Sequence, residues 1–307
     1  IYFSCSPLAG MDDVNGDICR MDFAHPSQVT RLTTSSGLNG EPAEWDEHAH
    51  LSPQGDAFIF MSSNGYGPSP YPQIDQLKTD AWIMNADGTG QTRVTYFNQP
   101  GSQDSIGEQA IVSDLDWNPD GTAIVMRVQF RFTANPDRIY ILPLCRDANS
   151  DSACDAAANP YPANAVAVQS DTVGPGDDLL FTSIRHLPSQ PPSGQQWYPE
   201  VFALDVDTMA YHRLTWMDSQ AMRHMALSPD HRKLAMTRIP ADTTGDGHLD
   251  EMDVQVVWIV DLAAGKAWPL TDAGDSAGPG GVDWLDNETV VFAYRRSGET
   301  QFDIAKA

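Results

Sequence analysis

The sequence predicts an all-β protein made of repeated antiparallel sheets with about four short strands each, which is the pattern of a β-propeller. Two observations lead to this prediction. Short apolar runs alternate with turns rich in Gly, Pro and Asp, and the same short motifs return about every fifty residues. One such sheet cannot bury its apolar faces alone, so recurrence is what stability requires.

The clearest unit of the repeat lies between Asp46 and Thr95. A Ser-Pro-Gln-Gly turn at 52–55 precedes an alternating apolar strand at 56–63, and a second strand at 80–85 ends in Asn. Turns of this kind between short apolar runs indicate an antiparallel meander. The unit closes with an Asp-Gly turn at 86–90 and a last strand at 92–95.

The turn and the closing strand of this unit both recur along the chain. Each copy of the turn stands before a short apolar strand, and the closing strands have sequences of the Arg-Leu-Thr kind. The turns recur at 118–121, 228–231 and 285–288, and the closing strands at 30–33, 212–215 and 268–271.

These motifs resemble those of the TolB-like β-propeller family, whose WD40-like repeats are also called PD40 repeats. The family motif is Ser-Pro-Asp-Gly, a strand, a strand ending in Asn-Ala-Asp-Gly-Thr-Gly, and then Arg-Leu-Thr, and residues 50–95 match it well. The resemblance implies four-stranded blades around a central channel, usually six of them. It implies less about activity, because such propellers serve as docking platforms, as peptidase lids and as sugar-acid lyases.

We therefore expect one six-bladed propeller domain over residues 1–307, with terminal blades that are incomplete in this chain. A closed ring has no free sheet edges, so the native polypeptide is expected to continue at one or both ends. The alternative is that the terminal strands complement one another in a shared blade. The expected blades are 1–33, 46–96, 112–168, 169–216, 221–271 and 280–307.

The composition narrows the choice of partners. The formal net charge is −24, with 18 Lys and Arg against 42 Asp and Glu. Such a surface repels phosphate backbones and anionic lipid headgroups, so we expect neither nucleic acid nor a membrane surface as partner. No apolar run is long enough to span a bilayer, and cations or basic protein surfaces are the expected partners.

The four cysteines are arranged as two local pairs. Cys5 and Cys19 fall on successive predicted strands, and Cys145 and Cys154 flank a polar loop. Neither pair has the Cys-x-x-Cys spacing of metal or redox sites. Two loop-closing disulfides are expected, which indicates a periplasmic or extracellular protein. The alternative is four buried thiols.

Residues 242–253 fit the twelve-residue calcium loop of EF-hand type. Oxygen donors occupy loop positions one, three, five, nine and twelve, and a glycine stands at six, where the chain must turn sharply. The flanking sequences are strand-like, so the loop would connect two strands and Ca²⁺ would be structural. The alternative is a solvated acidic loop. The expected ligands are Asp242, Thr244, Asp246, His248 through its backbone carbonyl, Asp250 and Asp253.

The strands before the recurring turns are expected to line the channel. Aligning the turns puts His48, Asp114, His224 and Gly281 in register, and one set of alternate side chains must point into the channel. A ring with two His and one Asp could hold a transition metal, as in lyases of the oligogalacturonate kind. The alternative is that these side chains bond to neighbouring backbone. The alternate positions are His50, Asp116, Ala226 and Asp283.

The sequence thus predicts a secreted or periplasmic docking scaffold that is stabilised by calcium and forms part of a larger protein. Loops at 64–78 and 187–198 are rich in Pro, Gly and Tyr or Gln, and they offer a rim for a protein or glycan partner. No Gly-x-Ser-x-Gly elbow supports nucleophilic catalysis. The alternatives are a metal-dependent polysaccharide lyase or hydrolase using His48, Asp114 and His224, or the propeller domain of a larger enzyme.

Overall fold

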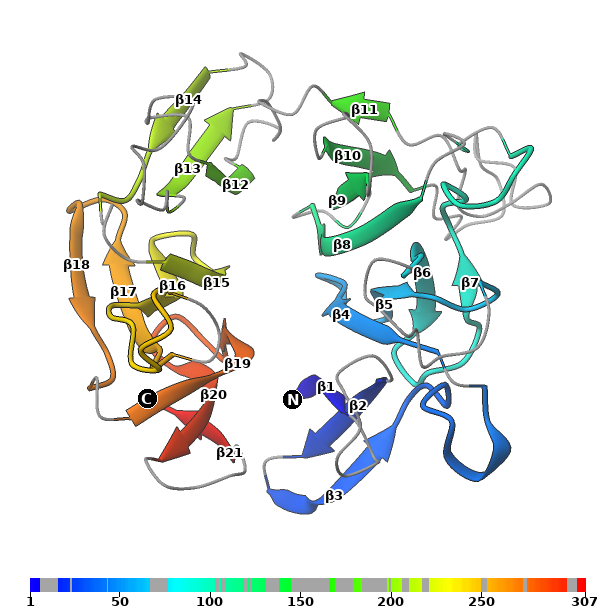
Figure 1. Ribbon diagram of the computed structural model, residues 1–307, viewed down its shortest axis with the longest axis horizontal. Coiled ribbons are helices and arrows are strands. Elements are labelled where there is room, and N and C mark those ends of the chain that lie inside the picture. The colour runs from blue at the N-terminus through cyan, green and yellow to red at the C-terminus, as the bar shows by residue number, and fades with distance from the viewer. Residues whose placement is uncertain are drawn as a thin grey trace. The chain divides into compact units, whose positions relative to one another are not determined.

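The computed structural model (Figure 1) divides into two compact units, residues 1–173 and 174–307, and each is described by itself. The structure describes residues 1–5, 16–22, 24–42, 44–66, 77–102, 105, 109–118, 121, 123–130, 138–144, 166–168, 179–183, 198, 200–205, 210–216, 221–249, 253–272, 275–296 and 303–307.

The described residues of the first unit form three antiparallel sheets whose strands follow one another in chain order, so the predicted meander is confirmed. The strands are β1 (Tyr2–Cys5), β2 (Asp17–Asp22) and β3 (His25–Arg31); β4 (Asp46–Leu51), β5 (Ala57–Ser62), β6 (Asp80–Asn85) and β7 (Thr92–Arg93); and β8 (Ala110–Trp117), β9 (Ala123–Phe130), β10 (Arg138–Pro143) and β11 (Val166–Val168). A 3-10 helix, η1 (Leu38–Gly40), lies between β3 and β4.

The second unit also contains three sheets in chain order. With them, the all-β prediction is confirmed for the part of the chain that the structure describes. The strands are β12 (Leu179–Ser183), β13 (Glu200–Asp205) and β14 (Ala210–Arg213); β15 (Ala221–Leu227), β16 (Lys233–Ile239), β17 (Val256–Asp261) and β18 (Lys266–Pro269); and β19 (Asp275–Trp284), β20 (Val290–Arg296) and β21 (Asp303–Lys306).

The recurring turns form for a local chemical reason. At the head of three of these turns a short polar side chain accepts the backbone N–H of the residue five positions later, which holds the hairpin closed. The donors are Ala57 to Ser52 Oγ at 3.2 Å, Ala123 to Asn118 Oδ1 at 2.7 Å, and Lys233 to Ser228 Oγ at 2.9 Å.

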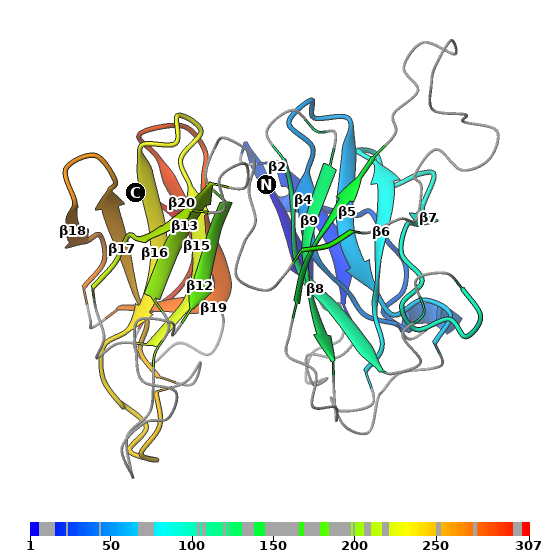
Figure 2. The ribbon, with the colours of Figure 1, turned by 90° about the horizontal axis from the view of Figure 1, so that it is seen from above.

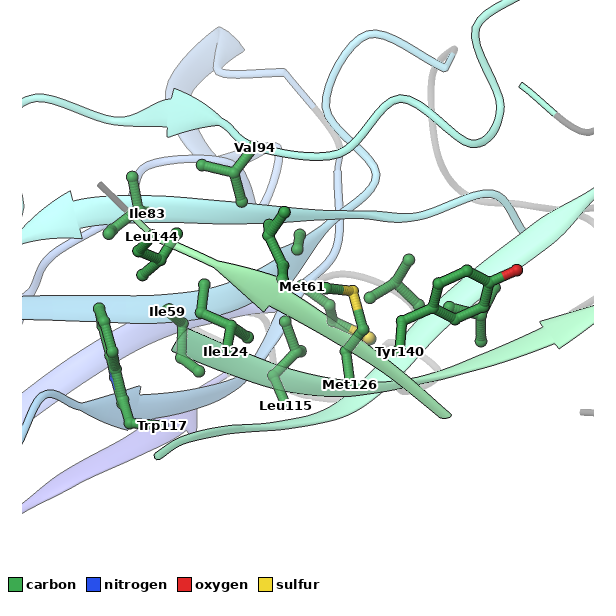
Figure 3. Packing of buried hydrophobic residues seen from close by; sticks show 14 of the residues in the cluster. Ile59, Met61, Ile83, Val94, Leu115, Trp117, Ile124, Met126, Tyr140 and Leu144 are labelled. Atoms are coloured by element: carbon green, nitrogen blue, oxygen red, sulfur yellow. The ribbon is translucent and has the colours of Figure 1, made fainter. Parts of the chain in front are cut away.

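The apolar core of the first unit lies mainly between sheets β4–β7 and β8–β11. Figure 3 shows Ile59 and Met61 of β5 facing Ile124 and Met126 of β9, with Leu115 of β8 beside them. All five side chains are almost fully buried. Two packed sheets thus satisfy the requirement that a single sheet cannot meet.

The predicted disulfide between Cys5 and Cys19 is confirmed and joins β1 to β2. The second predicted pair, Cys145 and Cys154, lies outside the described residues, as do 67–76 and 187–197 of the two rim loops. No helix among the described residues is long and apolar enough to cross a bilayer. The arrangement of the six sheets as one six-bladed domain, with the boundaries given above, stays a prediction.

Candidate functional site

The residues that the turn alignment put in register share one structural feature. The pairing of β4, β8, β15 and β19 with the next strand shifts register where His48, Asp114, His224 and Gly281 stand. Three of these residues have left-handed backbone, with φ of 53° at His48, 47° at Asp114 and 92° at Gly281. Each of these four strands therefore carries a β-bulge, which changes the direction of a side chain.

Two of these bulges carry a side chain at a conformational cost. A left-handed backbone costs a residue other than glycine about 1–2 kcal/mol, whereas Gly281 adopts it freely. The chain nevertheless has His48 and Asp114 at the two bulges of the first unit. Strained positions of this kind gather at functional sites, which makes the side chains of His48 and Asp114 candidate functional groups.

In the first unit the two bulge side chains face one another. His48 Nδ1 lies 3.9 Å from Asp114 Oδ1, and His48 Nε2 lies 3.7 Å from Glu47 Oε2. Arg127 Nη1 lies 3.5 Å from Asp114 Oδ2. These side chains are between one-third and about one-half exposed, so water screens their attraction. A second pair on the same strands, His50 Nδ1 and Asp116 Oδ1, is 3.6 Å apart.

In the second unit the equivalent residues, His224 and Gly281, also lie close together. A Cβ on Gly281 would lie 3.8 Å from His224 Nδ1, an ordinary van der Waals distance. The backbone N–H of His224 donates to Thr237 Oγ1 at 3.0 Å. His224 belongs to the second unit, and His48 and Asp114 to the first, so a metal site made of all three stays a prediction.

Both units have the same further contact, between β8 and β4 in the first unit and between β19 and β15 in the second. Trp117 Nε1 donates to the carbonyl of His50 at 3.0 Å, and Trp284 Nε1 donates to that of Ala226 at the same distance. These tryptophans therefore tie sheet to sheet. Among the described residues, Trp216 is 66% exposed. Arg213 Cζ lies 5.7 Å from the centre of its ring.

The predicted calcium loop leaves the end of β16 and extends beyond the strand ends (Figure 2). The Asp242 carboxylate accepts the backbone N–H groups of Gly245 at 2.5 Å and Gly247 at 2.8 Å. These bonds, that of Gly247 foremost, lower the pKa of Asp242 below its usual range. The chain thus turns around the first predicted ligand.

The two ends of the loop meet at Asp253, whose side chain is almost fully buried. Its Oδ1 accepts the N–H of Thr243 at 2.6 Å and the N–H of Thr244 at 3.0 Å. Asp246 accepts the N–H of His248 at 2.8 Å, and Asp250 lies outside the described residues.

The donor chemistry of this loop, carboxylates, hydroxyl and carbonyl, fits a hard cation such as Ca²⁺. No cluster of three or more His, Cys, Asp or Glu suited to a metal occurs within the described ranges, here or elsewhere. The calcium site stays a prediction.

Sequence reasoning missed a hydrogen-bond network at the closing strands. The closing strands are β3, β7, β11, β14 and β18, and the penultimate strands are β2, β6, β10, β13 and β17. The Thr of each Arg-Leu-Thr motif accepts the N–H of the second residue of the penultimate strand. These bonds join Ile18 to Thr33 at 3.0 Å, Ala81 to Thr95 at 2.9 Å, Val201 to Thr215 at 2.9 Å and Val257 to Thr271 at 3.0 Å.

The same threonines donate to an acidic residue at the first position of the penultimate strand, here called the acid position. Thr33 donates to Asp17 Oδ1 at 3.2 Å, Thr95 donates to Asp80 Oδ1 at 2.9 Å, and Thr215 donates to Glu200. All three acids are 0% exposed. Burying a carboxylate is costly unless it is paired, so a cation is expected beside each one.

The arginine of the Arg-Leu-Thr motif supplies that cation. Arg31 Nε donates to Asp17 Oδ2 at 2.7 Å, and Arg213 Nη2 lies 3.6 Å from Glu200 Oε1. In the remaining case Arg93 donates to the Tyr66 hydroxyl at 3.1 Å, and that hydroxyl donates to Asp80.

Where the acid is absent, the arginine is absent too. The first residue of β17 is Val256, and Pro269 stands opposite the third residue, at the position that arginine takes elsewhere. The first residue of β10 is Arg138, and Ala167 occupies the arginine position. In each of the five sheets with a closing strand, acid and arginine are therefore either both present or both absent.

Three buried acids carry further consequences. Glu200 Oε2 accepts a hydrogen bond at 3.0 Å from Nη2 of Arg238 in β16, and both residues are 0% exposed, so this pair joins two sheets of the second unit. Burial raises the pKa of Asp80 to about 6, and the pKa of Asp46 likewise to about 6.

Comparison with known proteins identifies the fold. TolB from Acinetobacter baumannii is similar with a TM-score of 0.61 and 15% identity, over 99% of this chain and 59% of that one. A putative TolB from Agrobacterium tumefaciens has a TM-score of 0.53 and 14% identity, over 91% of this chain and 80% of that one. A puromycin-hydrolyzing peptidase from Mycobacterium tuberculosis has a TM-score of 0.55 and 11% identity, over 100% of this chain and 43% of that one.

No family model matches the sequence, and no curated protein matches it. At these identities the likeness concerns the fold, and the chain has a TolB-like β-propeller fold. The chain spans 59% of the length of the Acinetobacter TolB and less than half of the peptidase.

Proposed function

We propose that this chain is a docking propeller of the periplasm or the extracellular space, that it binds a protein partner, and that it forms part of a larger protein. The observation that carries this proposal is the TolB-like fold together with a net charge of −24. A strongly anionic surface attracts a basic partner and speeds its association at low salt. The Cys5–Cys19 disulfide supports an oxidising compartment.

The docking function is tested by capturing partners from a periplasmic extract of the source organism and measuring each recombinant partner by calorimetry. We expect at least one partner with saturable binding that weakens steeply as salt rises from 50 to about 500 mM, because salt screens charge attraction. Binding by none of the recombinant partners would remove the docking function. A glycan partner would instead bind with little dependence on salt.

Calcium at residues 242–253 is the second part of the proposal. The ion would be held by Asp242, Thr244, Asp246, the His248 carbonyl, Asp250 and Asp253. Asp253 is two per cent exposed. A ligand that binds only the folded state stabilises it by mass action. We therefore expect 1 mM CaCl₂ to raise the melting temperature over EGTA, and Asp242→Asn to remove that shift. If CaCl₂ raised the melting temperature of Asp242→Asn as much as that of the wild type, the calcium would not bind at residues 242–253.

A second candidate is the propeller portion of a larger enzyme. It is favoured by the match to 43% of a peptidase over the whole of this chain. The complete reading frame tests it, since a hydrolase domain beyond these residues would establish it and the lack of one would remove it.

A metal-dependent lyase or hydrolase using His48, Asp114 and His224 needs stoichiometric Zn or Mn. Elemental analysis of the purified chain would detect either metal.

A further inference from the structure

Two histidines of β4 face aspartates of β8 in the first unit, where these two strands lie side by side (Figure 1). His48 Nδ1 lies 3.9 Å from Asp114 Oδ1, and His50 Nδ1 lies 3.6 Å from Asp116 Oδ1. The other ring nitrogen of His48, Nε2, lies 3.7 Å from Glu47 Oε2. His48 therefore has a carboxylate beside each of its two ring nitrogens.

The surroundings of His48 fit a charged imidazole better than a neutral one. A neutral imidazole has one N–H and one lone pair, so it turns a donor toward one carboxylate and a lone pair toward the other. A protonated imidazole has an N–H at both nitrogens. Histidine changes charge between about pH 5 and pH 8, a range in which exposed aspartate and glutamate stay charged. Acid therefore supplies the donor and the positive charge that the two carboxylates require.

We propose that His48 and His50 make the contact between β4 and β8 dependent on pH, so that acid strengthens this contact and alkaline solution weakens it. In acid the charged His48 ring attracts the carboxylates of Glu47 and Asp114, and the His50 ring attracts that of Asp116. In alkaline solution the three carboxylates face neutral rings and repel one another. This device goes beyond docking, because it belongs to the chain by itself.

Charged groups on β9 and β5 do not supply this dependence. Arg127 Nη1 of β9 lies 3.5 Å from Asp114 Oδ2, and an arginine stays charged throughout the range. β5, which pairs with β4, has no titratable side chain. The ion pairs that the two histidines make among the described residues are those with Glu47, Asp114 and Asp116.

The remaining charged groups near β4 lie on β4 itself, β1 and β2. On β1, Cys5 is held in the disulfide, and a tyrosine such as Tyr2 ordinarily titrates well above this range. Asp46, the buried first residue of β4, has a pKa raised to about 6 by burial, so it also titrates here. It must therefore be present in every chain that is compared. The charged side chains of β2 are Arg20, Asp17 paired with Arg31, and Asp22 paired with His25.

The second unit provides a contact of the same kind without these pairs. Gly281 of β19 stands where β8 has Asp114, so the position that faces His224 carries no carboxylate. Ala226 of β15 stands where β4 has His50. The contact between β15 and β19 should therefore lack this response to acid.

Two indole N–H groups report on the two contacts. Trp117 Nε1 donates to the His50 carbonyl between β8 and β4, and Trp284 Nε1 donates to the Ala226 carbonyl between β19 and β15, both at 3.0 Å. Hydrogen exchange of the full 307-residue chain, followed by NMR at pH 5 and pH 8, measures both indoles in one sample. The exchange rate of Trp284 divided by that of Trp117 is the relative protection of Trp117. Its value at pH 5 divided by its value at pH 8 is the acid gain, in which the intrinsic effect of pH on indole exchange cancels.

The main variant is Asp114→Asn/Asp116→Asn, which removes both facing charges and keeps the side-chain shape. Asparagine tolerates the left-handed backbone at 114, and the histidines and aspartates are 31 to 68% exposed, so the variant should fold. We expect an acid gain about fivefold larger in wild type than in this variant, as for two exposed ion pairs. Asp87→Asn, which removes an exposed acid elsewhere in the first unit, should have the wild-type acid gain.

The second variant tests whether the histidines are the groups that titrate. His48→Asn/His50→Gln should have the same reduced acid gain, and adding the two aspartate substitutions to it should change that gain by less than about twofold. Equal acid gains in wild type and Asp114→Asn/Asp116→Asn would overturn the proposal. So would an effect of the aspartates that persists without the histidines. An acid gain smaller in wild type than in the aspartate variant, as a metal held by the histidines at pH 8 would produce, would also overturn it.

Discussion

The sheets β4–β7 and β19–β21 use the same position in opposite ways. At the start of β6, Asp80 is buried beneath the closing strand and accepts a hydrogen bond from Thr95 at 2.9 Å. At the start of β21, Asp303 is exposed. Both aspartates are the first residue of the third strand of their sheet, and among the described residues only Asp80 lies beneath a closing strand.

The largest expected effect separates a buried acid position from the exposed one. Glu200→Ala should lower the free energy of unfolding by about 3–5 kcal/mol, because it leaves Arg238 buried without its partner carboxylate. Asp303→Ala should change it by less than about 0.5 kcal/mol, as for an ordinary surface residue. Urea denaturation of both variants measures the difference. Similar losses in the two variants would show that the acid positions are not distinguished by burial.

The pH dependence of the first unit sharpens the same contrast. Burial raises the pKa of Asp46 to about 6, above its ordinary value of 3.8. Its contribution to stability is therefore present below pH 3.8 and is lost as pH rises through about 6. Replacing Asp46 by Asn should stabilise the chain near pH 7 by up to about 3 kcal/mol, and by much less at pH 4.

Denaturant midpoints measured from pH 4 to 8 check this expectation, with Asp303→Asn as the exposed control. A constant difference between Asp46→Asn and wild type across that range would mean that Asp46 has no raised pKa.

The threonine of the closing strand should have a smaller effect. Thr95→Val keeps the shape of the side chain but removes the acceptor of the Ala81 N–H and a donor to Asp80. A buried group left without its partner costs about 1–3 kcal/mol. Thr95→Ser keeps the hydroxyl and should lose less. Thr271→Val, in a sheet with no acid at this position, should also lose less, and equal losses at 95 and 271 would contradict a role for the acid.

The smallest expected effect concerns the bulges. At His48, where φ is 53°, glycine adopts the backbone without strain and alanine does not. His48→Gly should therefore be about 1 kcal/mol more stable than His48→Ala in thermal or urea unfolding. At Ile59, in the middle of a regular strand, the same pair of substitutions should reverse in order. Failure of glycine to outrank alanine at 48 would remove the argument from strain.

The sequence predicted those features that depend on neighbours in the chain. Turn residues such as Ser52 and Asn118 mark the hairpins directly, because their side chains bond within five residues. The alignment of His48 with Asp114 follows from counting back from those turns. The Cys5–Cys19 pair lies on adjacent strands of one sheet, and so it could also be anticipated.

The acid position could not be anticipated in the same way, because its partners are distant in sequence. Glu200 meets Arg238 across 38 residues and two different sheets. A periodic pattern of apolar residues predicts strands but does not show which polar side chain ends up buried beneath another strand. The useful signal is the joint presence of an acid at the start of one strand and Arg-x-Thr in the next, as with Asp80 and Arg93.

Residue-resolved hydrogen exchange of the isolated chain tests the central claim most directly. The N–H groups of Ile18, Ala81, Val201 and Val257 donate to threonine hydroxyls of closing strands, and all four should exchange slowly. Ile304 is the second residue of β21, and no closing strand covers its N–H within the described part of the chain. In the isolated residues 1–307 this N–H should therefore exchange at least a hundredfold faster (about 2.7 kcal/mol less protection). Comparable protection at all five amides would contradict the account.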